Sequence, residues 1–323
     1  GAAAVITVVV PYYQREPGVL RRALQSIATQ RGCALPVRVI VIDDESPSPA
    51  EPEIASVGAM PSQVQLIRQR NGGPASARNT GLDNAPSGTR YIAFLDSDDV
   101  WSPDHLARAA HALQAGHDFF FGDFFQLDQT VGAFARAGRI RPAEHPPIDG
   151  LAELHTYQGD MLDQIIRGNV IGTSTVMHDF KPFRDRRFRT EFTNAGEDYL
   201  YWMEIAARGA RIAFSSTIEA TYGRGVNVYS GSGWGTEQHL LRVHNELRYK
   251  KTISRLFDVT ASQQKHIEIS VGLLREAFAG DLLHRMTHRK PTPLKLLAAH
   301  LALDPMSYLL LPATAIRLLA KRT

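Results

Sequence analysis

The stretch Tyr91-Ile92-Ala93-Phe94-Leu95-Asp96-Ser97-Asp98-Asp99 decides the fold, because a short apolar run leads directly into three carboxylates. Such a run predicts a buried strand that delivers its last residues to the rim of a sheet. Carboxylates this close repel one another unless a positive charge lies among them. Hard divalent cations take oxygen ligands and often share their coordination with phosphate. The tetrad Asp96–Asp99 therefore predicts either a site for a metal and a diphosphate, or an acidic turn that caps a helix beginning near Ser102-Pro103-Asp104.

The first hundred residues alternate strands and helices, which predicts an α/β fold. The expected strands are 5–10, 37–42, 64–67 and 91–95, and the expected helices are 18–29, 74–82 and 103–115. Repeated strand–helix units predict a mostly parallel sheet with helices on both faces. Ligands of such sheets bind beyond the carboxyl ends of the strands. The polar segments 12–14, 43–46 and 96–99 all fall at such ends.

The middle of the chain has weaker patterns. Strands are expected at 119–125, 169–177, 212–214 and 218–222, a helix at 196–208, a loop at 135–150 and a glycine-rich, mobile loop at 223–235. From residue 236 to 290 the pattern is helical. Residues 294–320 are apolar but are interrupted by Asp304-Pro305 and Pro312, so we expect no membrane span. Their short amphipathic helices either pack on the α/β domain that precedes residue 236 or lie in a bilayer interface.

Composition narrows the class of protein. The 323 residues suffice for one large or two modest domains, and the net charge of +3 is too mild to suggest a nucleic-acid partner. The single cysteine, Cys33, excludes an internal disulfide framework and fits a reducing compartment. No signal peptide is expected in 2–10, which lacks a basic lead-in. Basic clusters at 181–189 and 284–290, together with the apolar C-terminus, raise the option of an anionic membrane surface.

Five motifs in order resemble those of family-2 inverting glycosyltransferases of the GT-A fold. They are Val8-Val9-Val10-Pro11-Tyr12-Tyr13, Val41-Ile42-Asp43-Asp44-Glu45-Ser46, residues 71–81 (NGGPASARNTG), residues 94–99 (FLDSDD) and Gly196-Glu197-Asp198-Tyr199-Leu200-Tyr201-Trp202. The resemblance covers about residues 4–230. It implies a catalytic domain at 1–235, with a nucleotide-binding half at about 1–100 and an acceptor half at about 101–235. Residues 236–323 would form a helical C-terminal region that either packs on the catalytic domain or associates with membranes.

The resemblance implies a nucleotide site in the N-terminal half. Tyr13 matches an aromatic residue at the nucleotide base, although a strand-end aromatic can also simply pack. Pro11 precedes it in the same motif, and Asp44 matches a carboxylate that accepts from a ring N–H, for which uracil or thymine has the donor. Arg78 lies in the helix after the glycine loop. It is expected either to contact the nucleotide or a carboxylate, or to form an ion pair that supports the fold.

The resemblance also implies a metal and a catalytic base. Asp98 is expected to hold Mn²⁺ or Mg²⁺ directly, and Asp96 to reach the ribose or a metal-bound water, whereas Asp99 is expected to cap a helix. Asp198 is expected to be the general base that takes the proton of the acceptor hydroxyl, because an inverting transfer is a single displacement. Glu197 beside it is expected to orient the base or contact the acceptor.

Some features depart from the family pattern. The glycine-rich segment after the last expected strand has no histidine, and Arg224 is the nearest candidate for a phosphate contact. The Gln-x-x-Arg-Trp signature of processive synthases is absent, which favours the addition of one sugar. Hydroxyl side chains in 169–175 resemble an acceptor-side segment, and they either bind sugar or satisfy a strand end.

These observations predict a metal-dependent transferase. It would move one sugar from a nucleoside diphosphate, with UDP favoured, to a glycan or lipid-linked acceptor in surface polysaccharide synthesis. It would act in the cytoplasm, peripherally at the inner face of the cell membrane if the tail binds lipid. The alternatives are a nucleotidyltransferase that makes nucleotide sugars, which would need a glycine-rich basic loop after the first strand, and a catalytically inactive sugar-nucleotide-binding scaffold.

Overall fold

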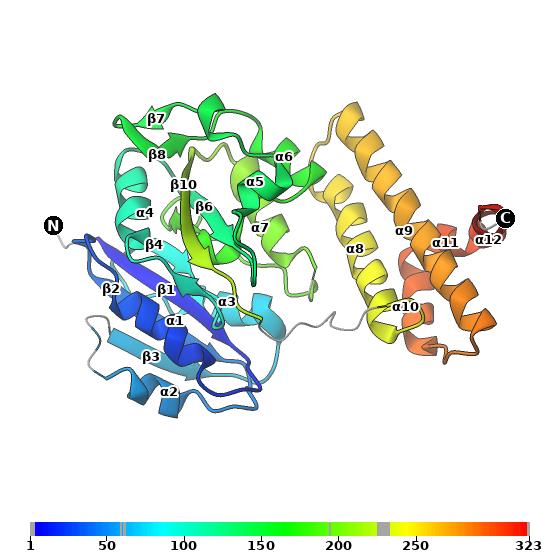
Figure 1. The fold of residues 1–323 in the computed structure, drawn as a ribbon, viewed down its shortest axis with the longest axis horizontal. Coiled ribbons are helices and arrows are strands. Elements are labelled where there is room, and N and C mark those ends of the chain that lie inside the picture. The colour runs from blue at the N-terminus through cyan, green and yellow to red at the C-terminus, as the bar shows by residue number, and fades with distance from the viewer. Residues whose placement is uncertain (1–3, 59, 61–62, 194, 225–232, 322–323) are drawn as a thin grey trace. The chain divides into compact units, whose positions relative to one another are not determined.

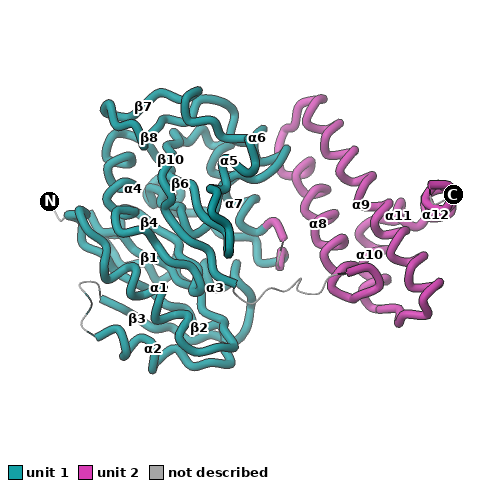
Figure 2. Tube along the Cα trace, viewed as in Figure 1, with its two compact units in different colours: residues 1–191, 197–226 teal, residues 192–196, 227–323 magenta. Residues whose placement is uncertain are grey.

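The computed structural model describes residues 4–58, 60, 63–193, 195–224 and 233–321. They divide into two compact units, of which unit 1 comprises residues 1–191 and 197–226 and unit 2 comprises residues 192–196 and 227–323 (Figure 2). The predicted division of the chain between residues 235 and 236 stays a prediction. Each unit is described by itself below.

Unit 1 is built on one mixed sheet (Figure 1). The strands run in the order β3-β2-β1-β4-β9-β6-β10-β8-β7, with β5 pairing to β10. Neighbours β3, β2, β1 and β4 are parallel, and β6 is parallel to β10, whereas β9 lies antiparallel between β4 and β6. The bounds are β1 Val5–Tyr12, β2 Val37–Asp43, β3 Gln63–Arg68, β4 Thr89–Phe94, β5 Val100–Trp101, β6 Phe119–Phe125, β7 Pro147–Ile148, β8 Leu151–Thr156, β9 Met177–Asp179 and β10 Ile212–Thr221.

Helices cover both faces of the parallel part. Their bounds are α1 Val19–Ala28, α2 Glu51–Ser56, α3 Gly73–Asp83, α4 His105–Gln114, α5 Ala133–Ala137, α6 Met161–Arg167 and α7 Glu197–Ala207. Side chains alternate along a strand, so Val8 and Val10 join a core with α1 and α4, while Val9 faces α3. A Cβ on Gly81 of α3 would lie 2.4 Å from Val9, so only glycine permits this close approach. The predicted α/β fold with helices on both faces is confirmed.

The structure corrects several predicted elements. The strand predicted at 169–177 is wrong except at Met177, because the chain makes a 3₁₀ turn at Thr173–Thr175 and β9 begins only at Met177. The two strands expected at 212–222 are one continuous strand, β10. The loop expected at 135–150 contains the end of α5, a 3₁₀ turn at Pro142–Glu144 and β7. The expected loop at 223–235 lies mostly outside the described residues.

Unit 2 is helical, as predicted. Its helices are α8 Glu237–Leu256, α9 Ala261–Thr287, α10 Leu294–Leu303, α11 Pro305–Leu309 and α12 Leu311–Ala320. Helix α8 packs along α9, α10 packs on α8, and α11 and α12 pack on α9. The start of α9 carries a capping box, in which Thr260 and Gln263 satisfy each other's backbone N–H groups. Among the described helices, none combines the length and apolar character needed to cross a bilayer.

Candidate active site

Hydrogen bonds hold together three loops that follow neighbouring parallel strands. The side-chain amide of Gln14, after β1, donates to the hydroxyl of Ser97, after β4, at 3.1 Å. The backbone N–H of Gln14 donates to the hydroxyl of Ser46, after β2, at 3.0 Å. Because β2, β1 and β4 are parallel neighbours, their carboxyl ends meet at one edge of the sheet. The predicted polar segments therefore lie together.

The two tyrosines at the end of β1 have different environments. Tyr12 is fully buried, and its hydroxyl donates to Glu53 at 2.8 Å. Tyr13 and Pro11 are only half-buried, so both keep accessible surface at the edge where ligands of such sheets bind. Their contacts with a nucleotide stay predictions.

Asp44 is buried and organises the loop before α3. Its carboxylate accepts from the backbone N–H groups of Gly72 and Gly73, at 2.8 and 2.9 Å, and from the Gln69 side chain at 2.7 Å. A carboxylate offers about four acceptor lone pairs, so this loop already uses most of them. The predicted contact of Asp44 with a nucleotide base stays a prediction.

The tetrad that follows β4 is anchored by Ser174. The Ser174 hydroxyl accepts from the backbone N–H of Asp96 at 3.0 Å and donates to the Asp99 carboxylate at 2.5 Å. Asp99 also accepts from the backbone N–H of Gly223 at 3.0 Å. Asp99 was expected to cap a helix; instead its carboxylate is buried beneath the loop and binds Ser174 and Gly223. Burial, reinforced by the charge of Asp96, raises the pKa of Asp98 to about 6.

Arg78 is the buried cation of the site. Its Nη2 donates to Asp96 at 2.9 Å, so the two side chains form an ion pair. The role of Arg78 toward a ligand stays a prediction. Burial acts to lower the pKa of Arg78, but the negative charges of Asp96, Asp198 and Glu197 outweigh it and raise that pKa. Its Nε and Nη1 have no hydrogen-bond partner within the described part of the chain. The three N–H groups on these two buried nitrogens therefore have no acceptor in the described part of the chain.

Glu197 and Asp198 begin α7, where backbone N–H groups favour negative charge. Asp198 accepts from the Thr173 hydroxyl at 3.0 Å and from the backbone N–H of Tyr199 at 2.9 Å. Burial raises the pKa of Asp198 despite the opposing charge of Arg78. Burial and the charge of Asp198 also raise the pKa of Glu197 to about 7. A carboxylate with a raised pKa can accept a proton near neutrality, as a general base must.

The hydroxyls of 173–175 position the acidic residues. Thr173 donates to Asp198, Ser174 donates to Asp99, and Thr175 donates to the carbonyl of Gly172. All three hydroxyls therefore already have protein partners. The alternative in which the hydroxyls of 169–175 bind sugar stays a prediction. The sequence showed these residues but not their acidic partners, which lie 25 and 75 positions away.

Tyr222 is a member of the site that the sequence did not single out. Its hydroxyl accepts from the backbone N–H of Ser174 at 3.3 Å, and its ring stacks on Phe124 with the centroids 4.4 Å apart. The aromatic-rich segment 119–125 was the only available signal. Tyr222 thus links the 3₁₀ turn to β6.

The donor set fits a metal that a substrate helps to hold. Among the described residues, no three His, Cys, Asp or Glu side chains converge on one point. Asp96 and Asp98 nevertheless provide two carboxylates at the rim, and Mg²⁺-type ions are often held by one or two carboxylates plus substrate phosphates. Five acidic side chains interact electrostatically here, namely Asp96, Asp98, Asp99, Glu197 and Asp198. The cation Arg78 interacts with three of them, Asp96, Glu197 and Asp198. A divalent cation would offset this excess of negative charge.

Arg224 contributes no contact to this cluster. Its side chain is 81% exposed and lies 3.8 Å from the equally exposed Asp128. The residues that follow it, 225–232, lie outside the described part of the chain. The predicted phosphate contact of Arg224 stays a prediction.

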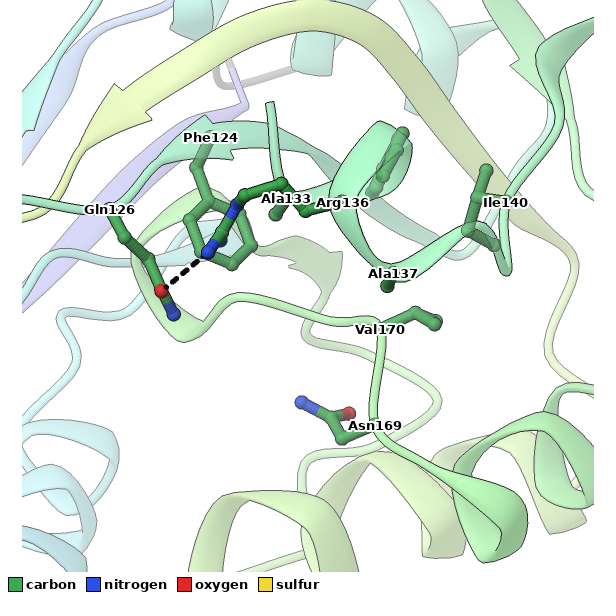
Figure 3. A pocket seen from close by; sticks show the side chains of 9 residues that line it. Phe124, Gln126, Ala133, Arg136, Ala137, Ile140, Asn169 and Val170 are labelled. Carbon is green, nitrogen blue, oxygen red and sulfur yellow. Dashed lines mark hydrogen bonds between the residues drawn. The ribbon is translucent and has the colours of Figure 1, made fainter. Parts of the chain in front are cut away.

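A cavity of about 310 Å³ opens beside the segment that leads into the 3₁₀ turn at Thr173–Thr175 (Figure 3). Its lining comes from the end of β6, from α5 and from the segment before the turn, namely Phe124, Gln126, Ala133, Phe134, Arg136, Ala137, Ile140, Asn169 and Val170. Phe124, which stacks on Tyr222, connects this cavity to the turn that carries Thr173 and Ser174. The cavity therefore lies in the half of unit 1 where an acceptor is expected.

Two solved structures have a fold similar to that of this chain. Residues 1–349 of TarS from S. aureus, in complex with UDP-GlcNAc, superpose with a TM-score of 0.55 and 18% identity, over 88% of this chain and 73% of that chain. The mannosyltransferase PcManGT from Pyrobaculum calidifontis, in complex with GDP-Man and Mn²⁺, gives a TM-score of 0.57 and 17% identity, over 98% and 86% of the two chains. At these identities the likeness concerns the fold.

Sequence comparison shows the family. The succinoglycan biosynthesis protein ExoW of Rhizobium meliloti (strain 1021) is 32% identical over 309 residues, which cover 94% of this chain and 95% of that protein. The model of the family described as glycosyl transferase family 2 matches residues 7–181. The matched region contains Asp44, Arg78 and Asp98. This protein therefore belongs to glycosyl transferase family 2.

Proposed function

We propose that this glycosyltransferase moves a single sugar, with inversion and with a divalent metal, from a nucleoside diphosphate to a hydroxyl of a glycan or glycolipid. One observation carries the proposal most directly. Asp198 begins a helix, is fixed by Thr173, and belongs to the same charged cluster as Asp96 and Asp98. A proton acceptor and a candidate diphosphate site therefore lie together, as a single displacement needs.

In the proposed reaction, the carboxylate of Asp198 takes the proton of the acceptor hydroxyl. The hydroxyl oxygen forms a bond to the anomeric carbon as the bond from that carbon to the diphosphate oxygen breaks. Thr173 holds one oxygen of Asp198, and the Tyr199 N–H holds the other. Glu197 is proposed to orient the base or contact the acceptor. Its Oε2 has no hydrogen-bond partner among the described residues.

Asp98 is proposed to hold the metal directly, with Asp96 near it or at the ribose. Mn²⁺ or Mg²⁺ bound there would stabilise the negative charge of the departing diphosphate. Arg78 pairs with Asp96, and the N–H groups on its Nε and Nη1, which have no partner among the described residues, are proposed to donate to the diphosphate or to a sugar carboxylate. Pro11, Tyr13 and Asp44 are proposed to contact the nucleoside, and Arg224 a phosphate.

UDP is the proposed nucleotide, because Asp44 can accept from the ring N–H of uracil. ExoW, which aligns along nearly the whole chain, is named for succinoglycan biosynthesis. That name supports a role in building surface polysaccharide. We propose a lipid-linked acceptor, with its sugar in the cavity beside the 3₁₀ turn, at the inner face of the cell membrane. The single Cys33 is consistent with the reducing cytoplasm.

Nucleotide binding tests the proposal first. Isothermal titration calorimetry would compare UDP, GDP and dTDP, each with and without Mn²⁺, on the protein and on its Asp98→Ala variant. We expect UDP to bind most tightly, and its binding to weaken without Mn²⁺ and in Asp98→Ala. The matched control is Asp258→Ala, which removes an exposed carboxylate of unit 2. Equal UDP binding with and without Mn²⁺ would contradict the metal site, and no binding at all would favour an inactive scaffold.

A further inference from the structure

Helices α10, α11 and α12 bury polar side chains and expose apolar ones. The buried side chains include His300 (0% exposed), Asp304 (0%), Ser307 (1%) and Thr314 (3%). The exposed apolar side chains are Leu294, Leu301, Met306, Leu309, Leu310, Ile316 and Leu319, which range from 39% to 74% exposed. Helices on the surface of a water-soluble domain show the opposite pattern. The arrangement suits a helical segment whose outer surroundings are apolar.

A buried polar network fixes this orientation. The Asp304 carboxylate receives two hydrogen bonds from Arg275 of α9, at 2.7 and 2.8 Å, and one from Lys251 of α8 at 3.2 Å. The Ser307 hydroxyl donates to Asp304 and contacts the His300 ring at 2.9 Å. Turning the leucines inward would strand these polar groups, since a buried charge without its partner is strongly unfavourable. The fold of unit 2 therefore holds the exposed apolar side chains of α10, α11 and α12 outward.

The exposed charges of the same segment are cationic. Between residues 288 and 321, the exposed charged side chains are Arg289, Lys290, Lys295, Arg317 and Lys321. The one acidic residue in this described stretch is the buried Asp304. Exposed leucines flanked by lysine and arginine complement an anionic bilayer, in which acyl chains take the leucines and headgroups take the cations.

We propose that α10, α11 and α12 insert their exposed apolar side chains into the interface of an anionic lipid bilayer. The helices would lie in the membrane surface, since none of them meets the requirements of a span. The purpose of the contact, delivery of a lipid-linked acceptor, rests on the proposed function. The binding itself does not require transfer, so the two can fail separately.

Flotation of the full chain with vesicles tests the proposal. The vesicles are phosphatidylcholine alone and phosphatidylcholine mixed with phosphatidylglycerol. We expect the protein to float with the mixed vesicles and far less with phosphatidylcholine alone. The combined variant Leu301→Gln, Leu309→Gln and Ile316→Gln should bind the mixed vesicles roughly 100-fold more weakly, at a few-fold to tenfold for each apolar side chain withdrawn from lipid. The matched control is Leu127→Gln with Val131→Gln, two exposed apolar residues of unit 1.

A second variant removes the charges. Lys290→Gln, Lys295→Gln and Lys321→Gln together should weaken binding to the mixed vesicles by about fivefold for each lysine. All altered side chains are exposed, so the thermal unfolding midpoint and UDP binding should stay as in the parent protein. These two measurements establish that each variant is folded before its lipid binding is interpreted.

Three results would overturn the proposal. The first is no flotation of the parent protein with the mixed vesicles. The second is equal flotation of the glutamine variant of Leu301, Leu309 and Ile316. The third is a parent protein that is a dimer in light scattering and a glutamine variant that is a monomer. In that case a second copy of the chain would cover the exposed apolar side chains. If this variant lost transfer to a lipid-linked acceptor but kept transfer to a soluble acceptor, that result would support the proposed membrane contact.

Discussion

The hydroxyl of Ser174 donates a hydrogen bond of 2.5 Å to the carboxylate of Asp99. The same hydroxyl accepts from the backbone N–H of Asp96. One serine in a 3₁₀ turn therefore fixes both ends of the acidic tetrad, and its neighbour Thr173 fixes Asp198. The turn couples the candidate metal site to the candidate base.

Replacing Ser174 by alanine should disturb the tetrad. The variant leaves the Asp96 N–H and one Asp99 oxygen without their partner, which should lower the free energy of unfolding by about 1–3 kcal/mol. The displaced tetrad should also need more Mn²⁺ for half-maximal UDP binding. Urea denaturation and Mn²⁺ titrations measure the two effects. Ser216→Ala is the control, because that hydroxyl makes one long contact of 3.4 Å; equal effects of both substitutions would contradict the anchoring role.

Asp198→Asn should abolish the proposed base without changing the shape of the side chain. We expect kcat to fall by about 10²–10⁴, while UDP binding stays unchanged. Burial raises the pKa of Asp198. In the pH profile of the parent, kcat should therefore fall on acidification at a pH above the usual aspartate pKa of about 3.9. Initial rates over a range of pH measure both. Asp185→Asn, at a surface ion pair with Arg208, should keep full activity, and full activity in Asp198→Asn would exclude it as the base.

Glu197 should make stability depend on pH. Its pKa is raised from 4.5 to about 7, so between these values the folded protein holds a proton that the unfolded chain has released. The free energy of unfolding attributable to Glu197 therefore falls as the pH rises through this window. Glu197→Gln, which carries no charge, should be more stable than the parent by roughly 1–3 kcal/mol at about pH 8, with little difference at about pH 5.

Urea denaturation at the two pH values measures this difference. The exposed Glu16→Gln is the control and should change stability little at either pH. A Glu197→Gln variant that is less stable than the parent at the higher pH would mean that attraction to Arg78 outweighs the cost of burying the charge.

Ala137→Trp tests the cavity as the acceptor site. Ala137 lines the cavity at the end of α5, so an indole there should obstruct it. We expect the KM for the acceptor to rise about tenfold or more, as for the loss of about 1.4 kcal/mol of binding, with UDP binding unchanged. Ala135→Trp is the matched control, since Ala135 is an exposed residue of the same helix outside the cavity lining. Equal acceptor kinetics in both variants would place the acceptor elsewhere.

Much of the nucleotide half could be predicted from local patterns. The apolar runs that became β1, β2 and β4 are continuous, and each leads into polar residues, so both the strands and the edge where they end were readable. The prediction of a strand at 169–177 was wrong because its apolar and hydroxyl residues are locally typical of a strand. Its turn is stabilised by Tyr222 and Asp99, which are distant in sequence.

The sequence by itself determined the family, the α/β sheet and the acidic residues that chemistry requires, because these depend on residue types and on short-range periodicity. Only the tertiary structure decided which polar groups are partners. It made hydrogen-bond partners of Asp99 and Ser174, of Arg78 and Asp96, and of Asp304 and Arg275. It also decided that Leu294, Leu301 and Leu309 are exposed, whereas Leu296 and Leu297 pack against the core of unit 2. A buried polar group takes whichever partner the packing brings within hydrogen-bond distance, and contacts across many residues leave no local pattern in the chain.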